Sequence, residues 1–478
     1  MRFSFAWIFV ATFSIENFGC RATDADASAL RRSLLAGGFA VLGDHSEADF
    51  VVLNTCTVTT AADSQAREAV RKIHRTNPGA RIIVTGCYAQ RAPEEIASLE
   101  GVAWVVGNSH QTEIAELLRT STAGPDSTAK HAARHQENNF VALSRLDDDG
   151  MSLARGPAKI LTGDIFAQTS IQIEPQDGEI EAGRTRPILK IQDGCNNRCS
   201  YCVIPLVRGS SRSLAPDAVV EEVHKLVAIG VKEIVLSGIN LGSYGRDFVP
   251  RVGLSDVVRR ILDETSLEQL RFSSVEPQDV TEDFVALVAS SERLARHFHV
   301  PLQSGSDKIL RGMHRWYRAA HYAERIQRIR KTIPDAAIGA DVIVGFPGES
   351  DDDFRTTYEF IESLPLTYLH VFSFSSRPGT KAADLGAQVN SAVIRERART
   401  LRLLSQRKSA EFRASQAGRK LRVITLARFG PDWTEALTSN YLKVRIAGRH
   451  AANLWCEAEI MADESAWRRT ETEVSLQK

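Results

Sequence analysis

The chain has 478 residues, of which 43% are hydrophobic and 25% are charged, and its 59 Lys and Arg residues balance 59 Asp and Glu residues. This length favours about three domains, and the composition is that of an ordinary globular protein. Seven cysteines, an odd number in a long chain, argue against a secreted disulfide framework. The lack of any uncharged apolar run of about 18 residues excludes a transmembrane helix.

The first residues imitate a signal peptide. Residues 2–13 place an apolar run after one arginine, and Gly19 with Cys20 loosely imitates a lipoprotein cleavage site. Glu16 and Asn17, directly before this pair, break the imitation. We therefore expect a cytoplasmic protein, and cysteines outside a disulfide framework suit that reducing compartment.

Residues 12–120 alternate between strand and helix patterns, which predicts an N-terminal domain with a parallel α/β sheet and right-handed crossovers. Short buried apolar runs give the strands, and amphipathic runs give the helices. The expected strands are Thr12–Phe18, Phe50–Asn54, Arg81–Thr85 and Val102–Val106. The expected helices are Asp24–Ala36, Thr60–Arg75, Pro93–Leu99 and Gln111–Leu118.

Three cysteines follow the ends of three of these strands. Cys20, Cys56 and Cys87 are far apart in the sequence, but the carboxyl ends of strands in an open α/β sheet share one edge, where ligands bind. The pattern favours a metal site assembled from distant loops. The alternative is that each cysteine is a small apolar residue at a strand end.

Residues 121–185 differ in character from the rest of the chain. They are polar, include the acidic run Asp147–Asp149, and repeat Gly, Pro and Gln. We interpret them as a linker or insertion on the surface. Strands are expected in it around Phe140–Leu146 and Ile171–Ile173.

The strand and helix alternation resumes over residues 186–416, where six strand–helix units predict an open (βα)6 partial barrel with its site at the strand ends. The expected strands are Ile188–Gln192, Glu233–Ser237, Leu270–Val275, His297–Val300, Ile338–Val344 and Tyr368–Phe374. The expected helices are Asp217–Ala228, Ser255–Glu264, Thr281–Ser290, Ala319–Thr332 and Asp351–Ser363.

A second set of cysteines follows the first of these strands. Cys195, Cys199 and Cys202 have C-x3-C-x2-C spacing, and no fourth Cys or His follows at zinc-finger spacing. Three cysteines can hold a 4Fe–4S cluster whose fourth iron stays open for a substrate or cosubstrate. The alternative is three scattered structural cysteines.

The C-terminal part is basic. Residues 390–416 predict a long Arg-rich helix, and short strands at Leu421–Ala427, Tyr441–Ile446 and Leu454–Met461 predict a small β-barrel over 418–478. Between residues 395 and 449 there are 14 Lys and Arg against 4 Asp and Glu, an excess of ten. This favours an anionic partner such as nucleic acid, although a solvated helix face is the alternative. Candidate stacking platforms are Trp433, Tyr441 and Trp455. The alternative is that these aromatic residues belong to the core of the small barrel.

The Cys195–Cys202 loop resembles that of the radical S-adenosylmethionine (SAM) enzymes, with Tyr201 as the aromatic residue that this family favours before its third cysteine. With both cysteine sets and the C-terminal barrel in view, the chain resembles the methylthiotransferases of that superfamily. Further stretches resemble family motifs: Ser237–Gly245, His299–Ser306 and Asp341–Glu349. The resemblance implies a C-terminal TRAM-type barrel that binds RNA.

The resemblance also implies two 4Fe–4S clusters. One, on Cys20, Cys56 and Cys87, carries the sulfur to be transferred. The other, on Cys195, Cys199 and Cys202, binds SAM. Further residues implied to contact SAM are Tyr201, Gly238, Asn240, Glu276, Gln303, Ser304, Asp341 and Gly345. Residues implied to contact RNA are Arg377, Arg419, Lys420, Arg422, Lys443 and Arg445.

The implied reaction uses SAM twice. One molecule methylates the sulfur on the N-terminal cluster, and a second is cleaved to a radical that removes hydrogen from C2 of an adenine. The implied partners are a tRNA anticodon stem-loop and an electron donor such as flavodoxin or ferredoxin, with no membrane. Cys456 lies outside both cysteine sets.

Three stretches resemble the members that act on N6-threonylcarbamoyladenosine at tRNA position 37: Gly86–Gln90, Lys190–Gly194 and Ser273–Pro277. A fourth stretch, Ser376–Thr380, resembles the tRNA enzymes rather than the member that acts on a ribosomal protein. Two alternatives within the family are N6-isopentenyladenosine in tRNA and an aspartate of a ribosomal protein. A third alternative belongs to another class: a non-catalytic iron–sulfur sensor that binds RNA.

Overall fold

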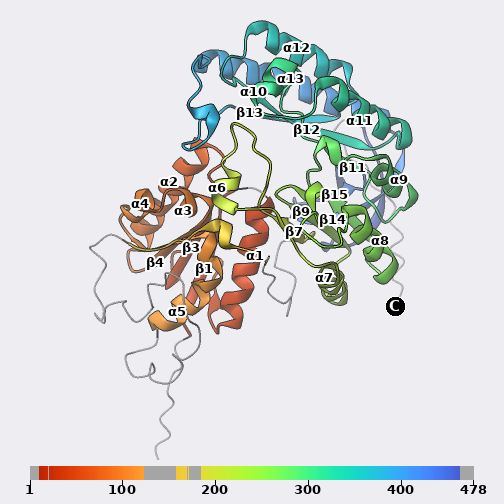
Figure 1. Cartoon of the computed structure of the whole chain (residues 1–478). Coiled ribbons are helices and arrows are strands. Elements are labelled where there is room, and N and C mark those ends of the chain that lie inside the picture. The colour runs from red at the N-terminus through yellow and green to blue at the C-terminus, as the bar shows by residue number, and fades with distance from the viewer. Residues whose placement is uncertain (1–9, 20, 123–157, 170, 172–184, 463–478) are drawn as a thin grey trace, which may run out of the picture. The chain divides into compact units, whose positions relative to one another are not determined.

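The computed structural model describes residues 10–19, 21–122, 158–169, 171 and 185–462. The chain forms two compact units, coloured along the sequence in Figure 1: Met1–Gln168 with Gln172–Glu174, and Thr169–Ile171 with Pro175–Lys478. Among the helices of the described residues, none combines the length and the apolarity that crossing a membrane requires. The strands expected around 140–146 and 171–173 fall, apart from residue 171, outside these ranges.

The first unit contains a six-stranded parallel sheet in the order β2-β1-β3-β4-β5-β6, so the predicted α/β sheet is confirmed. Its strands are β1 (Thr12–Asn17), β2 (Ala40–Val41), β3 (Phe50–Thr55), β4 (Arg81–Gly86), β5 (Val102–Gly107) and β6 (Lys159–Leu161). Its helices are α1 (Arg21–Ala36), α2 (Thr60–Thr76), α3 (Cys87–Arg91), α4 (Pro93–Ala97) and α5 (Ile114–Thr122). The short elements β2, β6 and α3 were not predicted, because two to five residues carry no periodicity.

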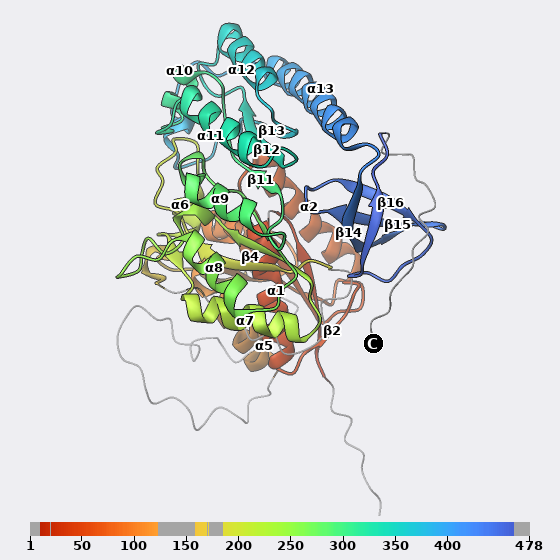
Figure 2. The ribbon, with the colours of Figure 1, turned by 90° about the vertical axis from the view of Figure 1, so that its right-hand side faces the viewer.

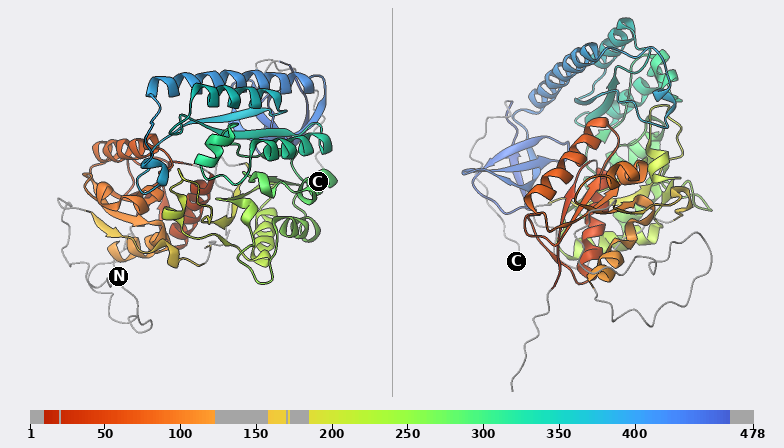
Figure 3. Two further views of the ribbon diagram at one scale, coloured as in Figure 1. Left: turned by 45° about the horizontal axis from the view of Figure 1, so that its top comes forward. Right: turned by 90° about the vertical axis from the view of Figure 1, so that its left-hand side faces the viewer.

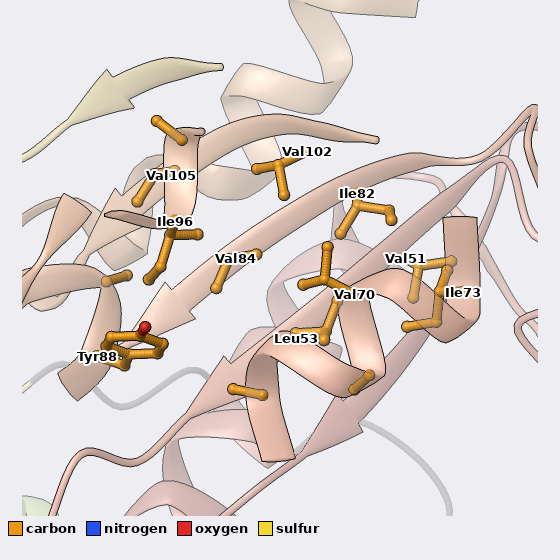
Figure 4. Close-up of a cluster of buried hydrophobic side chains, with 14 of the residues drawn as sticks. Val51, Leu53, Val70, Ile73, Ile82, Val84, Tyr88, Ile96, Val102 and Val105 are labelled. Atoms are coloured by element: carbon orange, nitrogen blue, oxygen red, sulfur yellow. The ribbon is translucent and has the colours of Figure 1, made fainter. Parts of the chain in front are cut away.

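Both faces of this sheet are covered. Val51 and Leu53 of β3 pack with Val70 and Ile73 of α2 in one hydrophobic cluster (Figure 4). The alternate residue Val52 packs in a second cluster, which includes Phe13, Leu30 and Leu34. A parallel strand buried on both faces has a continuous apolar sequence, which explains why β3, β4 and β5 were predictable.

The second unit begins with six parallel strands: β7 (Ile188–Asp193), β9 (Glu233–Gly238), β10 (Gln269–Phe272), β11 (His297–His299), β12 (Ala337–Val344) and β13 (Tyr368–Ser373). They pair in this order, and isolated parallel bridges join the β10 and β11 segments. A short antiparallel strand, β8 (Arg212–Ser213), lies on the outer side of β7. The predicted open (βα)6 arrangement is confirmed.

Helices follow the strands along the chain: α6 (Ile204–Arg208), α7 (Pro216–Ala228), α8 (Leu254–Glu264), α9 (Glu282–Ser290), α10 (Asp307–Gly312), α11 (Ala319–Thr332), α12 (Asp351–Ser363) and α13 (Ser391–Gln416). Helices α7, α8, α9 and α11 pack side by side outside the strands (Figure 2). In α8, residues 254, 257, 258 and 261 are buried, the spacing of one helix face.

Helix α13 packs along β13 (Figure 3). Some of the basic residues that the sequence suggested for RNA binding instead make contacts within the fold. Arg397 donates to the carboxylate of Glu349 at 2.7 Å, and Lys408 donates to the carbonyl oxygen of Leu364 at 2.8 Å. Arg413 is also buried. The local excess of positive charge is therefore partly internal.

The chain after α13 forms a four-stranded antiparallel sheet in the order β16-β15-β14-β17. Its strands are β14 (Lys420–Phe429), β15 (Trp433–Thr438), β16 (Lys443–Ala447) and β17 (Trp455–Glu459). Strand β15 was not predicted. Two of its buried positions are threonines, Thr434 and Thr438, so hydrophobic alternation is weak along it.

Arg271 joins this sheet to the barrel. Its fully buried guanidinium donates to the Glu233 carboxylate at 2.7 Å and to the carbonyl oxygens of Ser439 at 3.0 Å and Thr438 at 3.1 Å. Tyr441 stacks on His297 with ring centroids 4.1 Å apart. The prediction of Tyr441 as a base-stacking platform is wrong, because its ring packs against the barrel.

We predict that Arg271→Met lowers the free energy of unfolding of the second unit by about 3 kcal/mol, because it leaves the buried Glu233 carboxylate with only the longer contact to Arg186 at 3.4 Å and two carbonyl oxygens without their donor. Urea denaturation followed by circular dichroism measures this change. Arg259→Met is the matched control: its exposed pair with Asp283 should contribute less than about 1 kcal/mol. Equal effects of the two substitutions would contradict the assignment.

Candidate active site

The Cys195–Cys202 loop begins at the carboxyl end of β7. Gly194 has φ +68°, and a Cβ at this position would lie 2.0 Å from the carbonyl oxygen of Ser210, so glycine is required there. The Cys195 amide donates to the carbonyl oxygen of Gly209 at 3.1 Å, and that of Ser200 donates to Met313 at 3.0 Å. These backbone bonds hold both ends of the loop before any ligand binds.

A buried carboxylate fixes the strand end that carries this loop. Asp193 accepts from Lys190 at 2.9 Å, from Arg208 at 3.1 Å and from Arg212 at 3.1 Å. The Gly194 amide donates to the same carboxylate at 2.8 Å. Burial would raise the pKa of Asp193, but the three cations outweigh it and hold the pKa well below its ordinary value. The carboxylate therefore stays ionised at neutral pH.

Arg315 contacts the cysteine loop from the other side of the barrel. Its guanidinium donates to Sγ of Cys199 at 3.2 Å, to the Glu276 carboxylate and to the Tyr317 hydroxyl at 3.3 Å. The Arg315 side chain is only 3% exposed. Burial raises the pKa of Glu276, and Arg315 opposes that rise. The arrangement places one positive charge against the sulfur of a candidate cluster ligand.

The loop thiols suit a metal cluster. Burial raises the pKa of Cys202 to about 12 and that of Cys195 above its ordinary value. Because the thiolate is the metal ligand, these groups need a positive partner to lose their protons at neutral pH. The Asn197 amide donates to Sγ of Cys195 at 3.4 Å, and a hydrogen bond to a ligand sulfur is typical of iron–sulfur sites. The three residues therefore fit a 4Fe–4S cluster.

The residues predicted to contact SAM separate into two groups. Tyr201, Gly238, Asn240 and Glu276 belong to the cysteine loop or to neighbouring strand ends. The Asn240 amide donates to the Gln192 side-chain oxygen at 2.7 Å, and the Gln192 amide group donates to the carbonyl oxygen of Gly194 at 2.8 Å. Gln192 thus connects the end of β9 to the cysteine loop.

The other four residues predicted to contact SAM, which are Gln303, Ser304, Asp341 and Gly345, contact neighbouring strands and helices of the barrel unit. Ser304 is fully buried and lies 3.1 Å from the Thr357 hydroxyl. A Cβ at Gly345 would lie 2.4 Å from Ile394 of α13. Gln303 continues the strand pairing with β12 through its backbone, and Asp341 lies beside two histidines. For Ser304 and Gly345 these contacts favour a structural role, and their contact with SAM stays a prediction.

In the first unit, Cys56 and Cys87 directly follow the ends of adjacent strands β3 and β4, whose terminal residues Thr55 and Gly86 are paired. Both cysteines are buried. A Cβ at Gly19 would lie 2.7 Å from Cβ of Cys56, so the residue before Cys20 passes beside Cys56. Cys20 itself lies outside the described residues. The Asn108 amide group donates to Sγ of Cys87 at 3.5 Å.

The residues predicted to bind RNA lie mostly on the C-terminal sheet. Lys443 and Arg445 of β16 are exposed and alternate with buried Val444 and Ile446. Arg445 covers the Trp433 ring at 4.5 Å. Arg422 covers the Trp455 ring at 4.0 Å and pairs with Glu268.

The remaining three differ in exposure. Lys420 is exposed, and Arg419 pairs with Asp335 at 3.3 Å. Arg377 is buried in the loop after β13. An RNA phosphate could therefore contact this side chain only if the RNA entered the barrel at the end where this loop lies.

Sequence reasoning missed Asp193 and Arg315 as site residues. Arg315 lies between α10 and α11 in a stretch with no apolar period. Asp193 could have been found from its position at the end of a buried strand, directly before Gly194 and Cys195. A carboxylate is unusual at the end of a buried strand and indicates a partner of opposite charge.

Two family models match the chain. Residues 12–107 match a family described as "Uncharacterized protein family UPF0004", and residues 189–361 match the Radical SAM superfamily. Among solved structures, the radical S-adenosylmethionine methyltransferase TsrM from Kitasatospora setae, with cobalamin and a [4Fe-4S] cluster bound, has a TM-score of 0.55. It is 16% identical and covers 78% of this chain and 77% of its own, which shows a shared fold. The match of residues 189–361 to the Radical SAM model, which includes the cysteine loop, gives the class as radical SAM.

Two curated relatives match over most of their lengths. The Threonylcarbamoyladenosine tRNA methylthiotransferase MtaB of Aquifex aeolicus (strain VF5) is 34% identical over 91% of this chain and 96% of its own. The tRNA-2-methylthio-N(6)-dimethylallyladenosine synthase of Paenarthrobacter aurescens (strain TC1) is 34% identical over 88% of this chain and 75% of its own. The chain belongs to the methylthiotransferase family of radical SAM enzymes.

We predict that Arg315→Met lowers the reduction potential of the cluster on the Cys195–Cys202 loop, because a positive donor at a ligand sulfur favours the more negative reduced state. Loss of such an outer partner should also reduce SAM cleavage about 10–100-fold. Redox titration monitored by electron paramagnetic resonance measures the potential. Arg311→Met, at an exposed position of α10, is the control. An unchanged potential in the Arg315 variant would show that its contact with Cys199 is only structural.

Proposed function

We propose that this chain is a tRNA methylthiotransferase that adds a methylthio group to C2 of N6-threonylcarbamoyladenosine at tRNA position 37, next to the anticodon. The observation that carries the proposal is the placement of cysteines at the carboxyl ends of parallel strands in both units. The relative from Aquifex aeolicus, with nearly equal length and 34% identity, supports the choice of nucleoside.

Cys195, Cys199 and Cys202 would hold a 4Fe–4S cluster through three irons and leave the fourth for SAM. When bound, this cluster supplies the electron that cleaves SAM. Asp193 fixes the loop through its three cations, and Arg315 holds Cys199 and Glu276 in place.

Cys20, Cys56 and Cys87 would hold a second 4Fe–4S cluster that carries the sulfur for transfer. Support comes from the pairing of Thr55 with Gly86, which brings Cys56 and Cys87 to one sheet edge, and from Gly19 beside Cys56. An enzyme that joins a methylthio group to a carbon needs both a sulfur source and a means of activating that carbon. Two separate cysteine sites meet this need, whereas a sensor needs only one.

The exposed arginines and lysines on β14 and β16 would hold phosphates of the anticodon stem-loop. Arg422 over Trp455 and Arg445 over Trp433 combine a cation with an aromatic face, and both groups serve in RNA binding. An electron donor such as flavodoxin or ferredoxin would act as partner. We place the reaction in the cytoplasm, where tRNA is modified.

The identity of the nucleoside decides between this proposal and its alternatives. The measurement is mass spectrometry of tRNA nucleosides and of ribosomal proteins from cells that lack the chain and from the same cells that express it, with Cys199→Ala as the inactive control. We expect 2-methylthio-N6-threonylcarbamoyladenosine only in cells with the intact chain. A methylthio group on N6-isopentenyladenosine, or on a ribosomal protein, would transfer the assignment to that substrate. No change in either would favour a non-catalytic sensor.

A further inference from the structure

Three side chains on adjacent strands converge inside the barrel. His299 ends β11, Asp341 lies on β12 and His370 on β13. Asp341 is paired in register with His370, and His299 with Gly339, two residues before Asp341. Because residues two apart on a strand share a face, all three side chains project to the same side. Gly339 has no side chain, so nothing on β12 stands between His299 and Asp341.

The ligand-type atoms of these residues lie close together. Nε2 of His299 is 3.1 Å from Oδ1 of Asp341, and Nδ1 of His370 is 3.3 Å from the same oxygen. All three atoms lie within 4.8 Å of one another, and within the described residues this is the one such group of three. Ligands at about 2.1 Å from a common ion are about 3.0 Å apart in octahedral and about 3.4 Å apart in tetrahedral geometry. The two observed separations fall between these values.

The local hydrogen bonding leaves this convergence unexplained. His299 is only 6% exposed, yet among the described residues neither its Nε2 nor Oδ1 of Asp341 finds a hydrogen bond of acceptable geometry. A buried polar atom without such a bond is costly. The other ring nitrogen, Nδ1 of His299, lies 2.6 Å from the Ser274 hydroxyl. A hydrogen bond to the second nitrogen is the arrangement that orients a metal-binding histidine.

The types of donor in the group also suit a cation. Asp341 places a carboxylate between two imidazoles, and the nearby Glu276 is paired with Arg315. Among the described residues, the ion-pair contacts of Asp341 are with these two histidines and with no Lys or Arg.

We propose that His299, Asp341 and His370 form a binding site for a divalent transition-metal ion. Two imidazoles and one carboxylate are a ligand set for zinc or non-haem iron(II). The His370 side chain is 51% exposed, so the ion would keep open positions toward solvent for water or for an oxygen of a bound molecule. The site shares no residue with the two cysteine sets, but Asp341 is also one of the residues predicted to contact SAM, so the metal site rests on its own geometry and not on that prediction.

The alternative is a hydrogen-bonded His–Asp–His network without metal, and two variants separate the possibilities. In His370→Asn, the amide nitrogen replaces Nδ1. In His299→Gln, the amide nitrogen replaces Nε2. Each variant keeps a hydrogen-bond donor toward Asp341 but removes an imidazole ligand. His224→Ala, at an exposed position of α7, is the matched control.

The test uses the full chain loaded with iron and sulfide, dialysed against Zn²⁺ as the probe, with bound zinc measured by mass spectrometry of the elements. We expect one zinc per chain in the wild type and in His224→Ala. Dissociation constants should be at least about tenfold higher in the two other variants. X-ray absorption should show nitrogen and oxygen ligands near 2.0–2.1 Å rather than sulfur near 2.3 Å.

Retained iron content and circular dichroism verify that each variant is folded. If one variant does not fold, the other variant and the X-ray absorption spectrum of the wild type still decide whether these residues bind the metal. Three results would overturn the proposal: no zinc bound beyond the iron sites, zinc with sulfur ligands only, or equal zinc affinity in the folded variants and the wild type.

Discussion

Parallel strands end at a common edge, and the chemistry of this chain depends on that constraint. The sheet of the first unit and the six barrel strands of the second are paired in parallel, so residues far apart in the sequence arrive together at the carboxyl ends. In the first unit the ends of β3 and β4 bring Cys56 next to Cys87 in the paired register. In the second, the end of β7 carries three cysteines in one loop. The position of both cysteine sets at strand ends therefore has the same topological cause.

Inside the barrel, buried ion pairs determine which side chains meet. Asp193 with its three cations ends β7, Glu276 with Arg315 follows the end of β10, and Glu233 with Arg271 begins β9. Such pairs contribute little net stability, because desolvation offsets their attraction. Each pair, however, restricts the positions of its side chains, because a buried charge is stable only beside its partner. We infer that they fix the positions of the loop and of the C-terminal sheet.

Long elements with a clear period could be predicted, and so could the cysteine positions, because strand ends are visible where an apolar run stops. Contacts between distant side chains could not. Arg315 meets Cys199 across 116 positions of sequence, and His299, Asp341 and His370 meet only because their strands are neighbours. The basic C-terminal segment misled in part, since Arg397, Lys408 and Arg413 are buried and paired within the fold. Charge counted along a segment ignores partners from elsewhere.

The central claim is that the two cysteine sites have different roles, and one comparison tests it most directly. Purified Cys56→Ala/Cys87→Ala protein and Cys199→Ala protein are incubated with SAM, reductant and tRNA, and both 5′-deoxyadenosine and methylthio-nucleoside are measured. Iron content and circular dichroism establish that the unaltered site and the fold remain. The account predicts that the first variant still forms 5′-deoxyadenosine without methylthio product, whereas the second forms neither. Methylthio product from the folded Cys56→Ala/Cys87→Ala protein would contradict it.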